Sequence, residues 1–195
     1  MFNVKLLSPA VFVVVLILFG ACSNTKIETD DNFEVVELPD GSMAFLNHHS
    51  SLVYDENFEP RKIELQGEMF LSVKKNETPF MVSMDLGELT VTGTEFNVNS
   101  DKNKIEVEVE EGSVELKTKQ NNNRIRQGER AHYEKDGNEI KMGEAEFKFK
   151  IWLNNLHIEF KKLGKEIKHG SKHIEKESKE MGKELKKEIK KLNIK

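Results

Sequence analysis

The stretch spanning residues 87–117, GELTVTGTEFNVNSDKNKIEVEVEEGSVELK, constrains the fold more than any other part of the chain. Over residues 105–110, apolar residues alternate strictly with glutamates. A period of two places the apolar side chains on one face of a strand and the charged side chains on the other. Gly93, the polar cluster 100–103 and Gly112 divide the stretch into short segments. The pattern predicts antiparallel strands with one buried face and one face in water.

Turn signals recur about every ten residues over residues 34–140, without a long helical pattern between them. Pro39-Asp40-Gly41 predicts a hairpin, because proline presets φ and Asp-Gly tolerates a positive φ. Gln66-Gly67 separates two further apolar segments, which predicts two strands joined by a turn. The expected strands are residues 35–38, 42–46, 52–54, 61–65, 68–73, 79–84, 89–92, 95–98, 105–110, 114–116, 124–126 and 130–133. This spacing predicts an all-β domain built as a sandwich, a roll or a short β-helix.

The N-terminus has the pattern of an export signal. Residues 1–21 begin with a single lysine at position 5 and continue as a largely apolar run that is short for a membrane span. The run ends in small residues directly before Cys22, the only cysteine, as in a bacterial lipobox. We therefore expect a lipoprotein-type signal peptide and a lipidated Cys22. The alternative is an uncleaved signal anchor with Cys22 incidental. Both place the remaining chain in the bacterial cell envelope, lipid-anchored on the periplasmic or outer-membrane side in the first case.

Charge divides the exported chain into two parts. Residues 22–144 contain 14 Lys and Arg against 26 Asp and Glu, whereas residues 145–195 contain 15 Lys against 8 Glu. Residues 22–33 are polar, acidic and without apolar periodicity, so they are predicted to be a flexible tether. An acidic body with a basic tail indicates two modules with different partners.

Short motifs of the body occur together in a defined order. They are LPDGS at 38–42, LQGEMF at 65–70, PFMV at 79–82, VTGTEFNV at 91–98 and EGSV at 111–114. In this order and spacing they resemble the FecR domain family, with the resemblance covering residues 34–135. The residues matched to the family, expected to have structural roles, are Pro39, Asp40, Gly41, Gly67, Glu68, Pro79, Phe80, Gly93, Thr94, Phe96, Gly112 and Gly128.

FecR-family proteins regulate signalling across the envelope. The resemblance implies a FecR-like β domain at residues 34–140. It also implies a relay in which a TonB-dependent receptor contacts this domain and a cytoplasmic anti-sigma segment frees a sigma factor. Only residues 1–5 precede the apolar run, and a lipidated Cys22 would lose any connection across the inner membrane. The resemblance therefore implies the fold and a protein-interaction role, as an accessory in transmembrane signalling or iron-uptake regulation.

Residues 145–195 have the pattern of a long basic amphipathic helix. Apolar residues from Phe149 to Ile167 share one helix face, and Trp152 with Phe147, Phe149 and Phe160 is expected to dock on the β domain. An 11-residue period continues the stripe beyond position 170 among many lysines. The candidate membrane or partner-helix face consists of Ile167, Ile174, Met181, Leu185, Ile189 and Leu192. The alternative is a solvated helix whose first turns dock on the body.

Candidate sites for chemistry are few. His169 and His173 have the i,i+4 spacing of metal ligands, with His157 upstream, but no Cys or Asp joins them. His48-His49 lies in a predicted loop. A Gly-rich phosphate loop and a serine nucleophile motif are both missing from the sequence. The glutamates of residues 105–110 are expected to form a solvated face. We therefore expect no enzyme activity, cofactor, metal or nucleic-acid partner.

Taken together, these features predict an envelope lipoprotein that acts by binding a protein. The partner would be a TonB-dependent receptor or another signalling component, recognised by strand addition at an open sheet edge. The alternative is a structural envelope protein, with the β domain as a spacer and the basic helix associated with a membrane surface or a partner helix.

Overall fold

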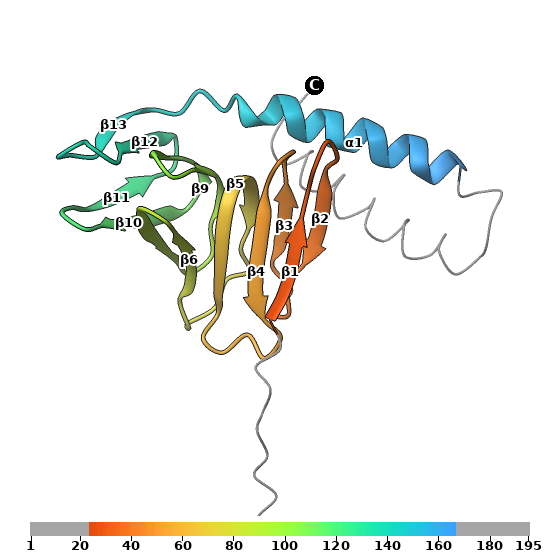
Figure 1. Ribbon diagram of the computed structural model, residues 1–195, viewed down its shortest axis with the longest axis horizontal. Helices are drawn as coiled ribbons and strands as arrows, with labels where there is room; N and C mark the ends of the chain where they lie inside the picture. The colour runs from red at the N-terminus through yellow and green to blue at the C-terminus, as the bar shows by residue number, and fades with distance from the viewer. Residues whose placement is uncertain (1–23, 167–195) are drawn as a thin grey trace, which may run out of the picture.

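The computed structural model describes residues 24–166, which form thirteen strands and one helix (Figure 1). The strands are β1 Asn24–Glu28, β2 Glu34–Glu37, β3 Met43–Leu46, β4 Ser51–Asp55, β5 Lys62–Ser72, β6 Phe80–Met84, β7 Gly87–Val91, β8 Glu95–Ser100, β9 Lys104–Glu111, β10 Ser113–Thr118, β11 Asn122–Arg126, β12 Glu129–Glu134 and β13 Lys141–Glu144. The helix is α1, Phe149–Glu166. The prediction of an all-β domain is confirmed.

The strands form two layers. Layer A has the order β1-β4-β5-β6-β7-β10-β11, and layer B has the order β2-β3-β5-β8-β9-β12-β13. Every pair is antiparallel except β5–β6. The two layers belong to one thirteen-stranded, barrel-like sheet, and β5 is common to both layers.

Strand β5 crosses from one layer to the other. Residues 62–66 pair with β4 and β6 in layer A, and residues 67–72 pair with β3 and β8 in layer B. Gly67 lies between these halves with φ of 92°. A Cβ atom there would lie 2.5 Å from Oγ of Ser50, so the crossing requires glycine for two reasons. The prediction of two strands separated by a turn at Gln66-Gly67 is therefore wrong.

The main core fills the space between the layers. Alternate residues of strands such as β9 and β10 supply it, as the period-two pattern of β9 predicts. The fully buried members include Leu46, Leu52, Ile63, Met69, Leu71, Phe80, Val82, Leu89, Phe96, Val98, Ile105, Val107, Val109, Val114, Leu116 and Ile125.

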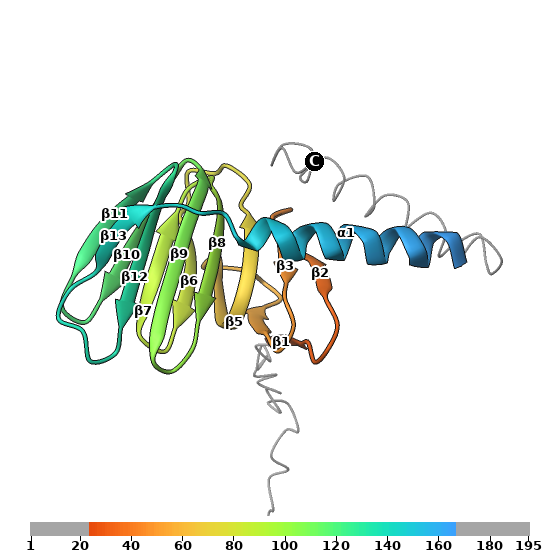
Figure 2. The same cartoon turned by 90° about the horizontal axis from the view of Figure 1, so that it is seen from above.

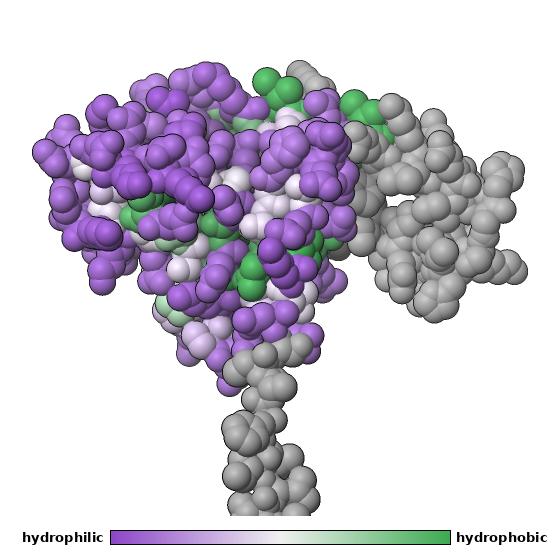
Figure 3. All heavy atoms as spheres, in the orientation of Figure 1, coloured by the Kyte–Doolittle hydropathy of each residue, from purple (hydrophilic) through white to green (hydrophobic). Residues whose placement is uncertain are grey.

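The outer faces of the two layers differ. Helix α1 crosses strands β5, β3 and β2 on the outside of layer B (Figures 1 and 2). Hydrophilic residues predominate on the face of the molecule shown in Figure 3, which exposes few hydrophobic atoms apart from small patches. The first turns of the tail therefore dock on the body, as in the interpretation of the tail as a helix that is solvated beyond its first turns.

Two elements were not expected. Residues 24–28 form β1 rather than a flexible tether, because they pair with all of β4 and the side chain of Ile27 packs against the main core. Strand β13 is exposed at each of its four residues, so it has no apolar alternation that could predict it. Both strands are held mainly by pairing with a neighbouring strand.

Several predictions concern residues outside 24–166. These are the signal peptide 1–21, Cys22, the histidines His169 and His173, and the candidate contact face of Ile167, Ile174, Met181, Leu185, Ile189 and Leu192. Among the described residues, no helix is both long and apolar enough to cross a membrane.

Candidate interaction surface

A second hydrophobic cluster lies outside layer B and joins it to α1. Val35, Phe45 and Phe70 point outward from β2, β3 and β5, and the buried face of α1 covers them. We call these three residues the helix-docking surface. The rings of Phe70 and Phe149 stack with their centroids 5.3 Å apart. The residues that α1 buries in this cluster are Phe149, Trp152, Leu153 and Leu156.

The carboxylate of Glu68 anchors α1 at the edge of the helix-docking surface. Its Oε1 accepts hydrogen bonds from Nε1 of Trp152 at 3.1 Å and from Nδ2 of Asn97 at 2.9 Å. Its Oε2 accepts a hydrogen bond from Nδ2 of Asn47 at 2.7 Å. The ring of Phe33 stacks on that of Trp152, with the ring centroids 6.0 Å apart. Three donors on one half-buried carboxylate fix the position of the indole, since bonds to a charged acceptor are strong.

The glutamates of β9 hold the segment that leads into α1. Oε1 of Glu108 accepts hydrogen bonds from the backbone N–H groups of Glu146 at 2.8 Å and Phe147 at 3.3 Å. Nζ of Lys150 lies 3.0 Å from Oε1 of Glu110. The expectation of a simply solvated glutamate face is therefore wrong for these two residues, because the connection from β13 to α1 covers them.

Charge pairs continue along this side of layer B. The hydrogen bond from Lys148 is the main cause that lowers the pKa of Glu146, and Arg130 adds to it at 3.2 Å. His132 lies between Glu106 at 3.1 Å and Glu134 at 2.9 Å, and its hydrogen bond lowers the pKa of Glu134. These are exposed contacts, so their stabilising effect is small.

A buried ion pair closes the β2–β3 hairpin. Asp40 accepts hydrogen bonds from Nε of Arg61 at 2.9 Å and from the backbone N–H of Ser42 at 2.8 Å. The side chains of Arg61 and Asp40 are only 7% and 9% exposed. Arg61 also donates to the carbonyl groups of Lys74 and Thr78. The pair joins three loops, and removing one partner would leave a buried charge without compensation.

These features can be compared with those of known proteins. Residues 25–115 match the family model described as FecR protein. This chain contains a FecR domain. The resemblance predicted from the motifs is thereby confirmed, and the domain begins within β1, ahead of the expected boundary.

The solved structures agree with this result. Two crystal structures of a putative anti-sigma factor from Parabacteroides distasonis share the fold. One is 26% identical with a TM-score of 0.62, and the match covers 67% of this chain and 64% of that one. The other is 27% identical with a TM-score of 0.61, over 66% and 63% of the two chains. The chain thus spans less than two thirds of the length of these neighbours. No curated protein matches.

The motif residues of the FecR domain serve different structural purposes. Phe80 and Phe96 are fully buried in the main core, and Pro39 and Pro79 lie in the loops that join β2 to β3 and β5 to β6. The motif glycines with positive φ are Gly41 at 78°, Gly67 at 92°, Gly112 at 86° and Gly128 at 79°. Glu68 accepts a hydrogen bond from Trp152 of α1, so it links the FecR domain to the helix.

The candidate metal ligands do not come together in the part of the chain that the structure describes. His157 is half-buried on α1 and His48 contacts the ring of Phe33, whereas His49 faces Asp31. Among residues 24–166, no group of three or more His, Cys, Asp or Glu side chains could hold a metal ion.

Sequence reasoning missed the anchor around Glu68. Asn97 belongs to the motif at residues 91–98, but neither it nor Asn47 was singled out as a partner of Glu68. Trp152 was assigned to the docking core without a polar partner. The sequence did contain one indication that this part of β5 is covered on its outer side. Residues 69–71 are apolar without alternation, as is typical of a strand that is buried on both faces.

Proposed function

We propose that this chain is an envelope lipoprotein whose FecR domain regulates signalling by binding a protein partner. The anchor at Glu68 carries the proposal most directly. A FecR motif residue fixes Trp152, so the position of the segment C-terminal to the domain depends on the state of the domain. A partner that binds the sheet can therefore influence the position of this C-terminal segment.

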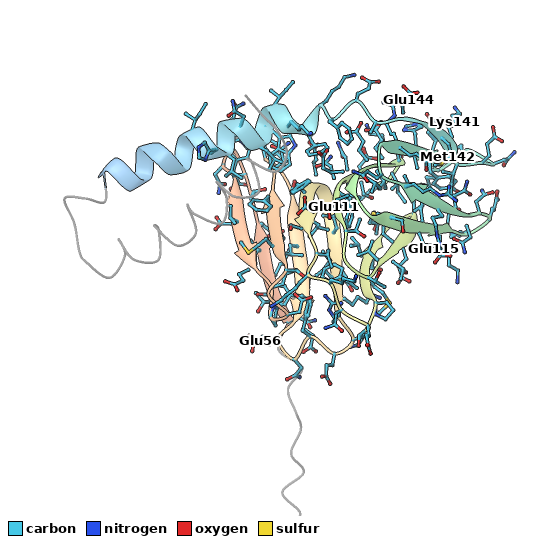
Figure 4. The ribbon with its side chains drawn as sticks, turned by 180° about the vertical axis from the view of Figure 1, so that it is seen from behind. Glu56, Glu111, Glu115, Lys141, Met142 and Glu144 are labelled. Atoms are coloured by element: carbon cyan, nitrogen blue, oxygen red, sulfur yellow. The ribbon has the colours of Figure 1, made fainter. Side chains whose placement is uncertain are left out.

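The open edge of layer B offers a place for such a partner. Strand β13 pairs with β12 and has no second neighbour among the strands described here. Lys141, Met142 and Glu144 project from it at the side of the molecule opposite the end of α1 (Figure 4). Met142 is 43% exposed. Strand addition to an exposed edge supplies backbone hydrogen bonds, and alternate side chains then select the partner. A TonB-dependent receptor or another envelope signalling component is the partner class that the family suggests.

A reporter for sigma-factor-dependent transcription tests this function in cells that lack the chain. Restoring the wild-type chain should return the reporter to its regulated level, whereas Cys22→Ser should fail because the unlipidated chain is misplaced. Ser23→Ala, one residue further on, is the matched control and should behave as wild type. A reporter that responds to none of these strains contradicts the proposed regulation.

A structural role is the second candidate, and the outer face of α1 favours it. Ile151 and Ile158 are 69% and 43% exposed, and Figure 3 shows hydrophobic atoms along the top of the molecule where α1 runs. Exposed apolar residues on a helix that leads into a basic tail suit a membrane surface. Sedimentation with vesicles containing anionic lipid tests this role. Binding that falls with salt and with Ile151→Ser plus Ile158→Ser supports it, and equal sedimentation of the variant contradicts it.

A further inference from the structure

A groove crosses the surface where the turns before β8 and after β9 meet β11. Its volume is about 580 Å³. Residues 92–94 line it together with Gly112 and Ser113. It lies on FecR motif segments that serve neither the helix-docking surface nor the anchor at Glu68.

Two glycines allow the segments of the groove to approach closely. A Cβ atom at Gly93 would lie 2.8 Å from Cα of Lys75, and one at Gly112 would lie 3.1 Å from the carbonyl oxygen of Gly93. Oγ1 of Thr94 donates a hydrogen bond to the carbonyl of Ser113 at 3.0 Å, which ties the two turns together. These contacts fix how closely the two turns that line the groove approach each other.

Three cations surround this groove in a body that is otherwise acidic. Lys75, Arg124 and Arg126 line it, all three are exposed, and none of them makes a side-chain ion pair with another residue in the range 24–166. Glu111 is the one carboxylate among the lining residues. Over residues 24–144, acidic residues outnumber basic ones by nearly two to one, so this local excess of positive charge is unusual for the domain.

Two carboxylates close in the sequence or register, Glu115 and Glu129, make hydrogen bonds to other groups. Glu115 lies opposite Arg124 in the β10–β11 register, but its Oε1 accepts a hydrogen bond from Nδ2 of Asn122 at 2.9 Å. Oε2 of Glu129 accepts a hydrogen bond from the backbone N–H of Arg126 at 2.7 Å. This contact does not involve the guanidinium group of Arg126. In Figure 4, Glu111 and Glu115 lie apart from each other, so they do not form one acidic patch beside the groove.

We propose that this groove binds an acidic, extended peptide segment of the partner protein. The proposal rests on the proposed function, since it assumes recognition of a protein. Guanidinium groups bind carboxylates in a bidentate geometry, and two arginines on one strand can hold successive acidic side chains. The groove is concave and much larger than a single small anion, whereas a membrane surface would require a flat or convex face. A peptide with acidic residues therefore fits both the shape and the charge.

The test uses the full chain in detergent micelles and a fluorescent octapeptide of alternating Glu and Ser. Fluorescence anisotropy should show salt-sensitive binding, and Arg124→Glu with Arg126→Glu should weaken it about tenfold or more, because attraction becomes repulsion. Lys117→Glu with Lys119→Glu is the matched control. It changes the charge equally on the neighbouring strand and turn outside the groove, and it should alter the affinity less than about twofold. A peptide of alternating Gln and Ser should not bind.

Equal losses in both double variants would show an effect of total charge and overturn the proposal. No loss in the arginine variant would place the peptide elsewhere, for example on the basic tail, and would also overturn it. Vesicles containing anionic lipid that compete fully with the peptide would assign the groove to a membrane instead. These outcomes concern binding by the purified chain, so they are distinguishable from the transcription result that tests the proposed function.

Discussion

The two outer faces of this FecR domain belong to one folded sheet, yet they have different surroundings. On layer B, Phe45 and Phe70 point away from the main core and are still fully buried, because α1 lies over them. On layer A, the corresponding outward positions carry polar residues such as Glu64, Thr90 and Lys117, and no helix covers them in the part described by the structure. Burial on the outside of layer B depends on a segment C-terminal to the domain.

This difference teaches how the tail and the domain depend on each other. An exposed apolar patch of phenylalanines would favour association with other molecules. Helix α1 covers this patch with its own apolar face, and a helix gains most of its stability in a protein from such packing rather than from intrinsic propensity. The domain and α1 therefore stabilise one another, whereas the outer face of layer A is stable without a cover.

The largest expected effect comes from truncating the helix-docking surface. Phe70→Ala should lower the free energy of unfolding by about 3–5 kcal/mol, because it leaves a cavity between layer B and α1. Thr90→Ala, at a half-buried outward position of layer A, should change it by about 0.5 kcal/mol or less. Urea denaturation followed by circular dichroism measures both. Equal effects on the two faces would contradict the contrast between them.

The helix side of the same contact gives the second prediction. Leu153→Ala should cost about 2–5 kcal/mol, because Leu153 is buried against the helix-docking surface. Trp152 is the only tryptophan, so its fluorescence emission reports on the docking of α1. In the Leu153→Ala variant, this emission should shift to the red at a lower urea concentration than the one at which the β-structure is lost. Ile151→Ala, on the exposed face of the same helix, should leave both transitions within about 0.5 kcal/mol of wild type. A variant at Leu153 whose fluorescence transition does not move would show that α1 docks without it.

Local patterns in the sequence predicted most of the strands, and the reasons for the failures are physical. The alternation around β9 and the hairpin at Asp40-Gly41 reflect local geometry, so they could be read directly. The crossing of β5 between the layers could not be predicted in this way. The sequence does not distinguish a glycine that forms a turn between two strands from one that bends a continuous strand. Whether Gly67 ends a strand or bends it depends on Ser50, which is distant in sequence.

The candidate site was predictable to a smaller extent. The motifs identified Glu68 as important without indicating its partner, since Trp152 lies 84 positions away along the chain. The docking of Trp152 and Phe149 was predicted from the helical spacing of apolar residues. The groove beside Gly93 and Gly112 was not anticipated, because its cations come from separate segments and no local pattern joins them.

A polar substitution sharpens the comparison further. Glu68→Gln keeps the size of the side chain but removes the charge and replaces one acceptor by a donor that faces other donors. Hydrogen bonds to charged groups contribute about 1.5–3 kcal/mol, so a loss of about 1–3 kcal/mol is expected, together with a red shift of Trp152 emission. Glu64→Gln, earlier in β5 on the exposed face of layer A, should be nearly neutral. If both variants unfold at the same urea concentration, the anchor does not stabilise α1.

The smallest expected effect is a pH dependence on the side of layer B. Lys148 and His132 lower the pKa values of Glu146 and Glu134 from the ordinary value of 4.5. A carboxyl group with a lowered pKa binds fewer protons when folded than when unfolded. Its stabilising contribution is therefore complete above the unfolded value and is lost as the pH falls through the folded value.

Urea midpoints at about pH 6 and about pH 3.5 measure this contribution. Glu134→Gln and Glu146→Gln should each reduce the difference between the two midpoints slightly, because each removes one titrating group. The change should stay small, since exposed ion pairs are screened by water and salt. If the difference between the midpoints grew in either variant, the folded chain would disfavour the ionised form of that glutamate. Such a result would contradict the favourable contacts with Lys148 and His132.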